Sequence, residues 1–318
     1  MLRTVAIKLA LLVPVLFLVS VGTFVLLQLG PGDPAAQVLG NTGTPADYQR
    51  IRTEMGLDQP PVQRYLDWLG GVLRGDLGQN LVPPIEDVSD RLLRAFPVNL
   101  QLAAMAIVLA LLIAVPLAMW SAYRAGGLVD RWISAGTIGV ISVPPFLVGL
   151  LLLLVFAIHL DWFPLGQWSR PSDDGLGQNL WHAFLPALTL ALAEAPVFAR
   201  LLRGDLVATL QEDFILAAKA KGMPGWHIML REALRPSSFS LITLAGVSAG
   251  RLLGGTILVE AVFVLPGVGN VIINAAQSND YKLVQGGVLL IAFIYLLLNL
   301  TVDVLYGYLD PRIRRRHA

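Results

Sequence analysis

Six long apolar segments constrain the fold of this chain more than any other feature. They cover residues 9–29, 99–121, 132–158, 182–203, 238–262 and 284–308. The hydrocarbon core of a bilayer is about 30 Å thick, and a helix of about 20 apolar residues can cross it. Because lipid offers the backbone no hydrogen-bonding partner, each segment is expected to be helical. The sequence therefore predicts an all-α membrane protein with six transmembrane helices.

The composition agrees with a membrane protein. Of the 318 residues, 55% are hydrophobic and only 14% are charged, whereas soluble domains carry about 25% charged residues. The absence of cysteine excludes disulfides and thiolate metal ligands. The net charge of +1 gives no reason to expect a nucleic-acid partner. The partner that this composition indicates is the lipid bilayer.

The first apolar segment differs from a cleaved secretory signal. Arg3 and Lys8 precede it, but its apolar run is longer than that of a signal peptide. It is followed by Gly30–Pro34, which contains no small-x-small cleavage pattern. We therefore expect an uncleaved transmembrane helix over residues 1–29.

Lysine and arginine predict the orientation of the chain, since they concentrate in cytoplasmic loops. With the N-terminus inside, the inner segments carry most of the cations, including Arg124, Arg131, Arg200, Arg203 and Arg314–Arg316. The short outer loops carry far fewer. Both termini are therefore expected in the cytoplasm, with a basic tail over 309–318 that also meets anionic lipid.

The remaining segments define an external region and a membrane core. Residues 30–98 are expected outside, with short amphipathic helices at 45–56, 61–73 and 85–96, the last of them at the membrane interface. Residues 99–308 are expected to form a core of five helices. Prolines within apolar segments predict bends, which serve either packing or hinge motion. These prolines are Pro116, Pro144, Pro145, Pro186 and Pro196.

Glycines and ionisable residues within the segments predict helix packing and a translocation path. Gly246, Gly250 and Gly254 form a small-xxx-small ridge that allows close helix approach. An ionisable group facing lipid costs at least about 2.5–3.5 kcal/mol, so such groups should face protein or water. These groups are Glu194, Arg251, Glu260 and Asp303.

We consider Arg251, Glu194 and Glu260 as candidates for the translocation path. Arg251, near the middle of its segment, either lines a pathway or braces helices against a carboxylate such as Glu194. Glu260 lies nearer a segment end, where a structural hydrogen bond is the alternative.

A polar stretch at 205–236 separates the fourth and fifth segments. Asp205 is predicted to cap a helix that presents one apolar face, formed by Leu206, Leu210, Phe214 and Ala217. Lys219 and Lys221 suit the last turn of this helix, and Gly222 is predicted to end it.

A second short helix is predicted from Pro224 to about Arg235, ending before Pro236. Two short cytoplasmic helices with apolar sides indicate a docking element for a partner.

The sequence offers no pattern of an enzyme. It contains no Gly-x-x-x-x-Gly-Lys phosphate loop, and its four histidines lack metal-ligand spacing. The chain is expected to be a non-catalytic membrane subunit that binds neither metal nor cofactor itself.

Ordered motifs along the chain resemble binding-protein-dependent ABC permeases. The stretch Asp213–Gly222, followed by Leu230–Arg235, resembles the "EAA" loop of that family. Further matching stretches are Pro31–Pro34, Leu57–Pro60, Tyr65–Leu69, Arg74–Gly78, Gly254–Gly255, Val259–Phe263, Pro266–Gly269, Asp280–Tyr281, Val284–Gly286 and Leu309–Ile313. The likeness is to the peptide/nickel group, and within it to the B-type subunit of dipeptide and oligopeptide importers. Leu216 replaces the glutamate that names the loop, and Ser240 stands where the family has a proline.

The resemblance implies a fold, partners and contact residues. The fold is that of a type I ABC importer (MetI-like) permease with an extra N-terminal helix. The implied partners are a second (C-type) permease subunit, two ATP-binding subunits that hold ATP and Mg, and an extracytoplasmic solute-binding protein. The resemblance also implies that the protein is located in the bacterial inner membrane. The residues that would contact the ATPase are Asp213, Ala217, Ala218, Lys219, Lys221 and Gly222, with Arg231 in support.

The expected function is thus ATP-driven import of di- or oligopeptides. Importers of nickel, glutathione and oligosaccharides share the implied scaffold. Two other classes remain open at this point. One is a secondary, ion-coupled transporter that uses Glu194, Arg251 or Asp303, and the other is a scaffold subunit without a transported substrate.

Overall fold

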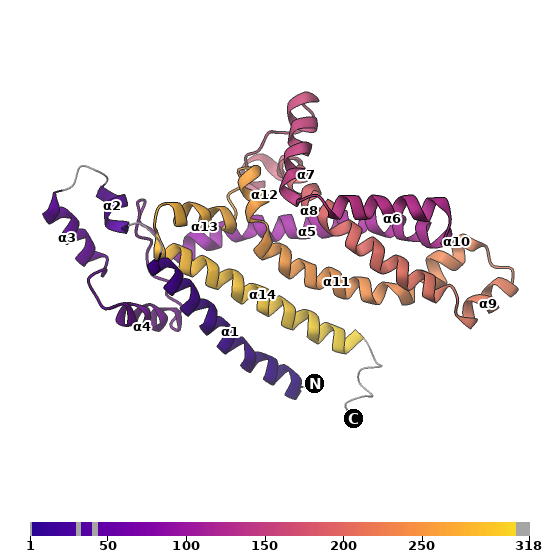
Figure 1. Cartoon of the computed structure of the whole chain (residues 1–318), viewed down its shortest axis with the longest axis horizontal. Helices are drawn as coiled ribbons and strands as arrows, with labels where there is room; N and C mark the ends of the chain where they lie inside the picture. Colours follow the sequence, from indigo (N-terminus) through magenta and orange to yellow (C-terminus); the bar gives the residue numbers. More distant parts are fainter. Residues whose placement is uncertain (1, 30–32, 40–43, 310–318) are drawn as a thin grey trace. The chain divides into compact units, whose positions relative to one another are not determined.

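The computed structural model describes residues 2–29, 33–39 and 44–309, and these residues form helices joined by loops (Figure 1). One isolated β-bridge pairs Gln79 with Asp87. The helices are α1 (Leu2–Leu29), α2 (Pro34–Leu39), α3 (Pro45–Glu54), α4 (Pro61–Val72), α5 (Val88–Tyr123), α6 (Leu128–Ile141), α7 (Pro145–Leu152), η1 (Leu153–His159), α8 (Pro171–Thr209), α9 (Asp213–Ala220), α10 (Gly225–His227), η2 (Ile228–Ala233), α11 (Leu234–Gly255), α12 (Ile257–Val262), α13 (Val268–Gln277) and α14 (Tyr281–Leu309). The basic tail predicted at 309–318 lies, beyond Leu309, outside the described residues.

The first of two compact units combines the N-terminal part of the chain with segments that lie after residue 252. It comprises Met1–Asn99, Leu253–Ala261 and Leu265–Leu300. Its core joins the start of α5 to α13 and α14 through buried apolar residues, which are Val88, Leu92, Ala95, Val268, Ala275, Leu283 and Val284. Residues far apart in the sequence therefore share one apolar core in this unit.

The second unit comprises Leu100–Leu252, Val262–Val264 and Thr301–Ala318. Its core is rich in alanine. On α5 the buried alanines recur every fourth residue, at Ala110, Ala114, Ala118 and Ala122. They pack in one cluster with Ala191, Ala195, Phe198, Ala199, Leu202 and Leu206 of α8. Small side chains on both helices let their backbones approach closely.

The predicted apolar segments are helical, but not all of them qualify as spans. Four helices in the described part of the chain are long and apolar enough to cross a membrane: Leu9–Leu29, Val88–Tyr123, Pro171–Thr209 and Tyr281–Val302. Leu128–Ile141 and Pro145–His159 make a fifth candidate if counted as one span. Helix α11 is not among these candidates, because serine, glycine and Arg251 interrupt its apolar residues. The six-span count therefore stays a prediction.

At Pro144 a proline bends a span, as the sequence predicts, whereas α5 and α8 continue through Pro116, Pro186 and Pro196. The helices on either side of Pro144 meet at 97°, since proline lacks the N–H that would continue the helix. Helix α8 contains Gly175 with φ +84° and ψ 163°, so its first turn is separate from the long helix that follows.

Three predicted boundaries are wrong. Residues 85–96 do not form a separate interfacial helix, because from Val88 onward they are the first turns of the 36-residue helix α5. The fifth segment is not continuous over 238–262: α11 ends at Gly255, and a new helix begins at Ile257. The pair Gly254-Gly255 explains this break, since glycine favours helix ends.

The third error concerns Asp205. It is not a helix cap, because α8 runs through it to Thr209.

The short helices predicted at 45–56 and 61–73 are confirmed as α3 and α4. Thr44 caps α3 through a reciprocal pair of bonds: the backbone N–H of Asp47 donates to the Thr44 hydroxyl, and the Asp47 carboxylate accepts from the Thr44 N–H. Pro45 occupies the first turn, where its missing N–H costs nothing.

The glycine ridge of α11 contacts α14 within each unit. In the second unit, a Cβ added to Gly246 would lie 2.8 Å from Val302 Cγ2. In the first unit, a Cβ on Gly254 would lie 2.9 Å from Ile291 Cγ2. Gly250, which lies between these two glycines in the sequence, is buried. The neighbour of this ridge is thus a helix of the same chain.

A leucine at Gly246 should therefore destabilise the protein by about 1–3 kcal/mol, because overpacking forces its neighbours to move. Gly139→Leu is the matched control, since a Cβ there meets nothing within 4 Å. The free energy of unfolding in detergent micelles, followed by circular dichroism, measures both variants. Equal stability of the two variants would contradict the close α11–α14 contact.

Candidate functional site

The cytoplasmic loop region predicted at 205–236 forms an elbow, defined as residues 210–233 between α8 and α11. Leu210 caps the C-terminal end of α8, and Glu212 is extended, with φ −71° and ψ 151°. The Glu212 carbonyl accepts the N–H groups of Ile215 and Leu216 at 3.0 and 3.3 Å. Helix α9 then begins with Asp213, a negative charge that suits the N-terminal end of the helix dipole.

Gly222 makes the corner of the elbow. Its φ of +75° is a conformation that costs residues with a Cβ about 1–2 kcal/mol. The Gly222 N–H donates to the Lys219 carbonyl at 2.9 Å, and the Met223 N–H donates to the Ala218 carbonyl at 3.3 Å. These two bonds form a Schellman motif, which satisfies carbonyls at the end of α9. The predicted stop at Gly222 is therefore correct.

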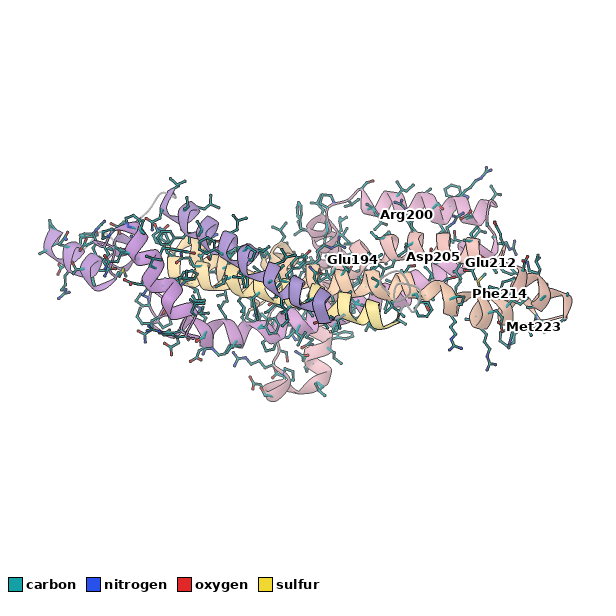
Figure 2. All side chains as sticks on the ribbon, turned by 90° about the horizontal axis from the view of Figure 1, so that it is seen from below. Glu194, Arg200, Asp205, Glu212, Phe214 and Met223 are labelled. Carbon is teal, nitrogen blue, oxygen red and sulfur yellow. The ribbon has the colours of Figure 1, made fainter. Side chains whose placement is uncertain are left out.

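The elbow buries one face and exposes the other. Ile215 and Ala218 are buried, in one core cluster with Ile228 and Met229 of η2 and with residues of α5 and α8. The exposed apolar side chains are Phe214 at 47%, Leu216 at 55%, Trp226 at 67% and Leu230 at 50%. Figure 2 shows Glu212, Phe214 and Met223 close to one another in the elbow. The elbow thus presents an apolar surface that its own chain does not cover.

The predicted ATPase-contact residues do not all share that surface. Those exposed are Asp213, Ala217, Lys219, Lys221, Gly222 and Arg231. Ala218 instead faces the core of its own chain, with 7% exposure. Its spacing of three residues from Ile215 places it on the buried stripe of α9.

Two further expectations for this region are wrong. Leu206 belongs to α8 and Leu210 caps it, so neither lies on one helix with Phe214. The second short helix does not end before Pro236, because the π-helix η2 leads directly into α11. Pro236 is the third residue of α11 and therefore lies inside a continuous run of helix.

Arg251 and Glu194 form an ion pair within the second unit. The Arg251 guanidinium donates to both carboxylate oxygens of Glu194 at 2.7 Å, and the Ser248 hydroxyl donates to the same carboxylate at 2.8 Å. The Glu194 side chain is 7% exposed and that of Arg251 is 61% exposed. Arg251 therefore braces α11 against α8, as one prediction has it, and still presents a cation on the surface of the unit.

Glu260 has different surroundings, in the first unit. It is fully buried and accepts from the Asn99 side chain at 2.6 Å, the Asn270 N–H at 2.8 Å and the Thr256 hydroxyl. Gly267 and Gly269 leave room for this carboxylate, because a Cβ at either position would meet it. These bonds tie the start of α5 to α12 and α13. The side chain of Asp303 lies outside the described residues.

A buried ion pair was missed by the sequence analysis, in which Arg203 counted only as an inner cation. Asp130 of α6 accepts from Arg203 Nε and a terminal guanidinium nitrogen, both at 2.6 Å. It also accepts from the Ser121 hydroxyl and from the Gly126 N–H at 2.8 Å. The pair joins α5, α6 and α8 within the second unit. The sequence does carry a signal for this pair. Asp130 stands at the start of one apolar segment, and Arg203 stands at the end of another.

Asp205 lies within α8, and its Oδ2 atom is buried without a hydrogen-bond partner in the described part of the chain. Among the described residues, no cluster of three histidine or carboxylate side chains could hold a metal ion.

Comparison with known protein families shows to which family the chain belongs. Residues 114–315 match the model of the binding-protein-dependent transport system inner membrane component, and residues 1–83 match the N-terminal model of such membrane components. The chain belongs to this permease family. Its membership confirms the resemblance inferred from the ordered motifs.

Known permeases of this family resemble the chain over nearly its whole length. A probable peptide ABC transporter permease protein, y4tP, of Sinorhizobium fredii is 34% identical, with 95% of this chain and 96% of that protein covered. The probable D,D-dipeptide transport system permease protein DdpB of Escherichia coli is 36% identical, with 93% of each covered. The glutathione transport system permease protein GsiC of Pectobacterium atrosepticum is 34% identical, with 95% of this chain and 96% of that protein covered.

A solved structure supports the permease fold. A chain of the MetNI methionine ABC transporter in an inward-facing conformation matches with a TM-score of 0.56 and 18% identity. The match covers 69% of this permease and 96% of that chain. The expected MetI-like fold is thereby confirmed, and the permease is a multi-pass membrane protein.

The Asp130–Arg203 pair should contribute more to stability than a surface pair. In a double-mutant cycle with Asp130→Asn and Arg203→Gln, we expect a coupling free energy of about 1.5–3 kcal/mol, because the bonds to charged groups are buried. The control cycle uses Asp47 and Arg50, which lie 3.9 Å apart and are mostly exposed; it should give less than about 1 kcal/mol. Unfolding free energies in micelles measure both cycles. Similar coupling in both would refute the special role of the buried pair.

Proposed function

We propose that this permease is a membrane subunit of an ATP-driven peptide importer, and that the elbow is its contact with the ATPase. The observation that carries the proposal is the exposed apolar surface of the elbow. Its exposed apolar side chains belong to a region whose other face is anchored in the core of the second unit. Several large apolar side chains left exposed in one short region are typical of a site of protein interaction.

The chemistry of the elbow defines the partner surface. Burial of Phe214 and Leu216 would each contribute about 1.5–3 kcal/mol, so the partner must offer an apolar cleft. The small side chains of Ala217 and Ala220 allow α9 to approach the walls of this cleft. Lys219 and Lys221 favour acidic groups at its rim. Each ATPase subunit, holding ATP and Mg, would supply one such cleft.

Movement of the ATPase would reach the membrane helices through the buried face of the elbow. Ile215 and Ala218 pack in the same cluster as Phe198 of α8 and Ala118 of α5. A displacement of α9 therefore moves these helices with it. A partner that holds α9 differently in two nucleotide states changes the balance between two states of the permease.

The Glu194–Arg251 ion pair is the favoured candidate for the translocation path. Arg251 keeps 61% of its side chain exposed although it lies in α11, which the sequence predicts to cross the membrane. An exposed cation there requires water or a protein partner, which the path between this chain and a second permease subunit would supply. Glu260, being fully buried and hydrogen-bonded, is assigned the structural role instead.

The substrate class follows from the relatives. Those named above are called permeases for peptide, D,D-dipeptide and glutathione. We therefore assign peptides as substrates, delivered by an extracytoplasmic binding protein to the outer face. Both termini would lie in the cytoplasm of a bacterial cell with the elbow, as the distribution of lysine and arginine predicts.

Peptide uptake by the reconstituted assembly tests the function. The permease, its second permease subunit, the ATPases and the binding protein are placed in liposomes. We expect uptake that requires ATP and continues after an ionophore has collapsed all ion gradients. Uptake that stops when the gradients collapse would establish the ion-coupled alternative. Normal assembly with the ATPases but no peptide uptake would indicate that the protein is a scaffold subunit.

The corner at Gly222 tests the coupling route. Gly222→Val should abolish most peptide-stimulated ATP hydrolysis, because a β-branched residue strongly disfavours φ near +75°. Gly222→Asn is the matched control, since asparagine tolerates this conformation. The ATPase rate of the reconstituted assembly, with and without binding protein and peptide, measures both. Full stimulation in the valine variant would rule out this route.

A further inference from the structure

Helix α4 leaves an apolar stripe exposed in the first unit. Val62, Leu66 and Leu73, the last of which caps the helix, are each more than half exposed. Their spacing of four and seven residues places them on one side of the helix. Gln63 and Asp67, also exposed, each follow an apolar residue of the stripe and are therefore rotated from it by about 100°. The exposed surface of α4 thus divides into an apolar face and a polar face.

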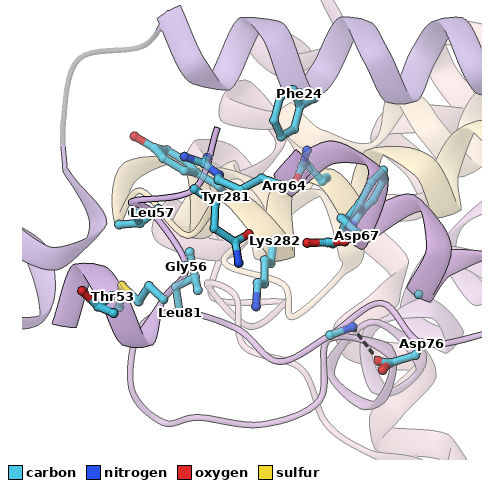
Figure 3. Close-up of a pocket in the computed structure, with 16 residues that line it drawn as sticks. Phe24, Thr53, Gly56, Leu57, Arg64, Asp67, Asp76, Leu81, Tyr281 and Lys282 are labelled. Carbon is cyan, nitrogen blue, oxygen red and sulfur yellow. Dashed lines mark hydrogen bonds between the residues drawn. The ribbon is translucent and has the colours of Figure 1, made fainter. Parts of the chain in front are cut away.

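Another side of α4 packs against the span α1. The hydroxyl groups of Tyr65 and Ser20 share a hydrogen bond of 2.8 Å. The Tyr65 ring lies 5.3 Å from the Phe24 ring and 6.4 Å from the Phe17 ring, centre to centre, both edge-on. The Arg64 guanidinium carbon lies 5.9 Å from the centre of the Phe24 ring, and Figure 3 shows these two side chains close to one another. Contacts from three successive turns of α1 thus hold α4 alongside it.

These contacts place α4 at the depth of the hydrocarbon core. The apolar part of α1, Leu9–Leu29, is long enough to span a bilayer. Ser20 lies nine residues before Leu29, which corresponds to about 14 Å of helix. The Tyr65 hydroxyl at Ser20 therefore reaches nearly halfway into a core about 30 Å thick. Because Tyr65 also contacts Phe24, α4 itself lies against the half of the span that ends at Leu29.

The exposed stripe of α4 thus adjoins a helix that itself faces lipid. Leu18, Val25 and Leu26 of α1 are exposed, as expected of side chains that contact acyl chains. Acyl chains cover apolar side chains without a matching surface, whereas a protein partner would need one. A helix with one apolar and one polar face lies in the plane of the membrane interface, with its apolar face buried by about 5–10 Å. Lipid is therefore the partner that fits both faces of α4.

We propose that α4 is an interfacial helix, which inserts Val62, Leu66 and Leu73 among the acyl chains of the leaflet at the Leu29 end of α1. Gln63 and Asp67 would face the lipid headgroups. The helix would thereby hold this part of the first unit on the membrane surface. The inference rests on the membrane span of α1 and does not depend on the proposed transport of peptides.

Site-directed spin labelling tests the proposal, because the chain has no cysteine and a single introduced cysteine is the only one that it labels. The permease is assembled with cysteine-free partner subunits in lipid nanodiscs. Val62→Cys and Leu66→Cys report on the apolar face, and Gln63→Cys and Asp67→Cys are matched controls one residue away. Leu18→Cys on α1 is the lipid-facing reference. Collision rates with oxygen, which concentrates in lipid, and with a water-soluble nickel chelate are measured for each label.

The ratio of oxygen to nickel-chelate collisions should be several-fold higher at 62 and 66 than at 63 and 67, and should approach the ratio at 18. Equal ratios at the four positions of α4, with frequent nickel-chelate collisions, would place the helix in water. Rare collisions with both reagents at 62 and 66 would show that protein covers the stripe. Either result would overturn the proposal. All five positions are exposed, so the labels leave the core intact, and thermal unfolding curves confirm that each variant is folded.

Discussion

Polar groups inside apolar helices must find partners within the protein, and the structure depends on this constraint. The Glu194–Arg251 pair, the bonds around Glu260 and the Asp130–Arg203 pair each satisfy it by joining helices that are distant in the sequence. Removal of one partner would leave an uncompensated buried group, which costs far more than the bond contributes. Each set of bonds therefore fixes which helices are neighbours within its unit.

The elbow follows a different principle, because only one of its faces packs against the rest of the second unit. Helix α9 is too short to be stable alone, so its order derives from Ile215 and Ala218 in the core of the second unit. The Schellman bonds at Gly222 then fix the direction of the chain after α9. A short helix held in this way presents its outer face in a fixed orientation, which suits recognition by a rigid partner.

The helical class, the resemblance and the outline of the elbow could be predicted from the sequence, because apolar length, proline and glycine act locally. Helices α3 and α4 were predicted for the same reason, from turn residues such as Thr44 and Pro45. Helix boundaries at Asp205 and Val88 could not be predicted, since a long helix continues wherever packing supports it. The break after Gly255 does have a local signal, the glycine pair, which the sequence analysis did not use as a helix end. The hydrogen-bond partners of Asp130 and Glu260 could not be predicted either, because only the folded chain brings together residues that are distant in the sequence.

The alanine stripes of α5 and α8 have a mechanical consequence. Interlocked leucines resist translation, because each must change rotamer to pass its neighbour. A methyl group has no rotamers, so the part of the cluster that α8 fills with Ala191, Ala195 and Ala199 presents a smooth surface, unlike the part that contains Phe198, Leu202 and Leu206. Small sliding movements of packed helices are a known mode of conformational change. In the second unit, α5 and α8 could therefore slide along each other at their alanines with little repacking of the core.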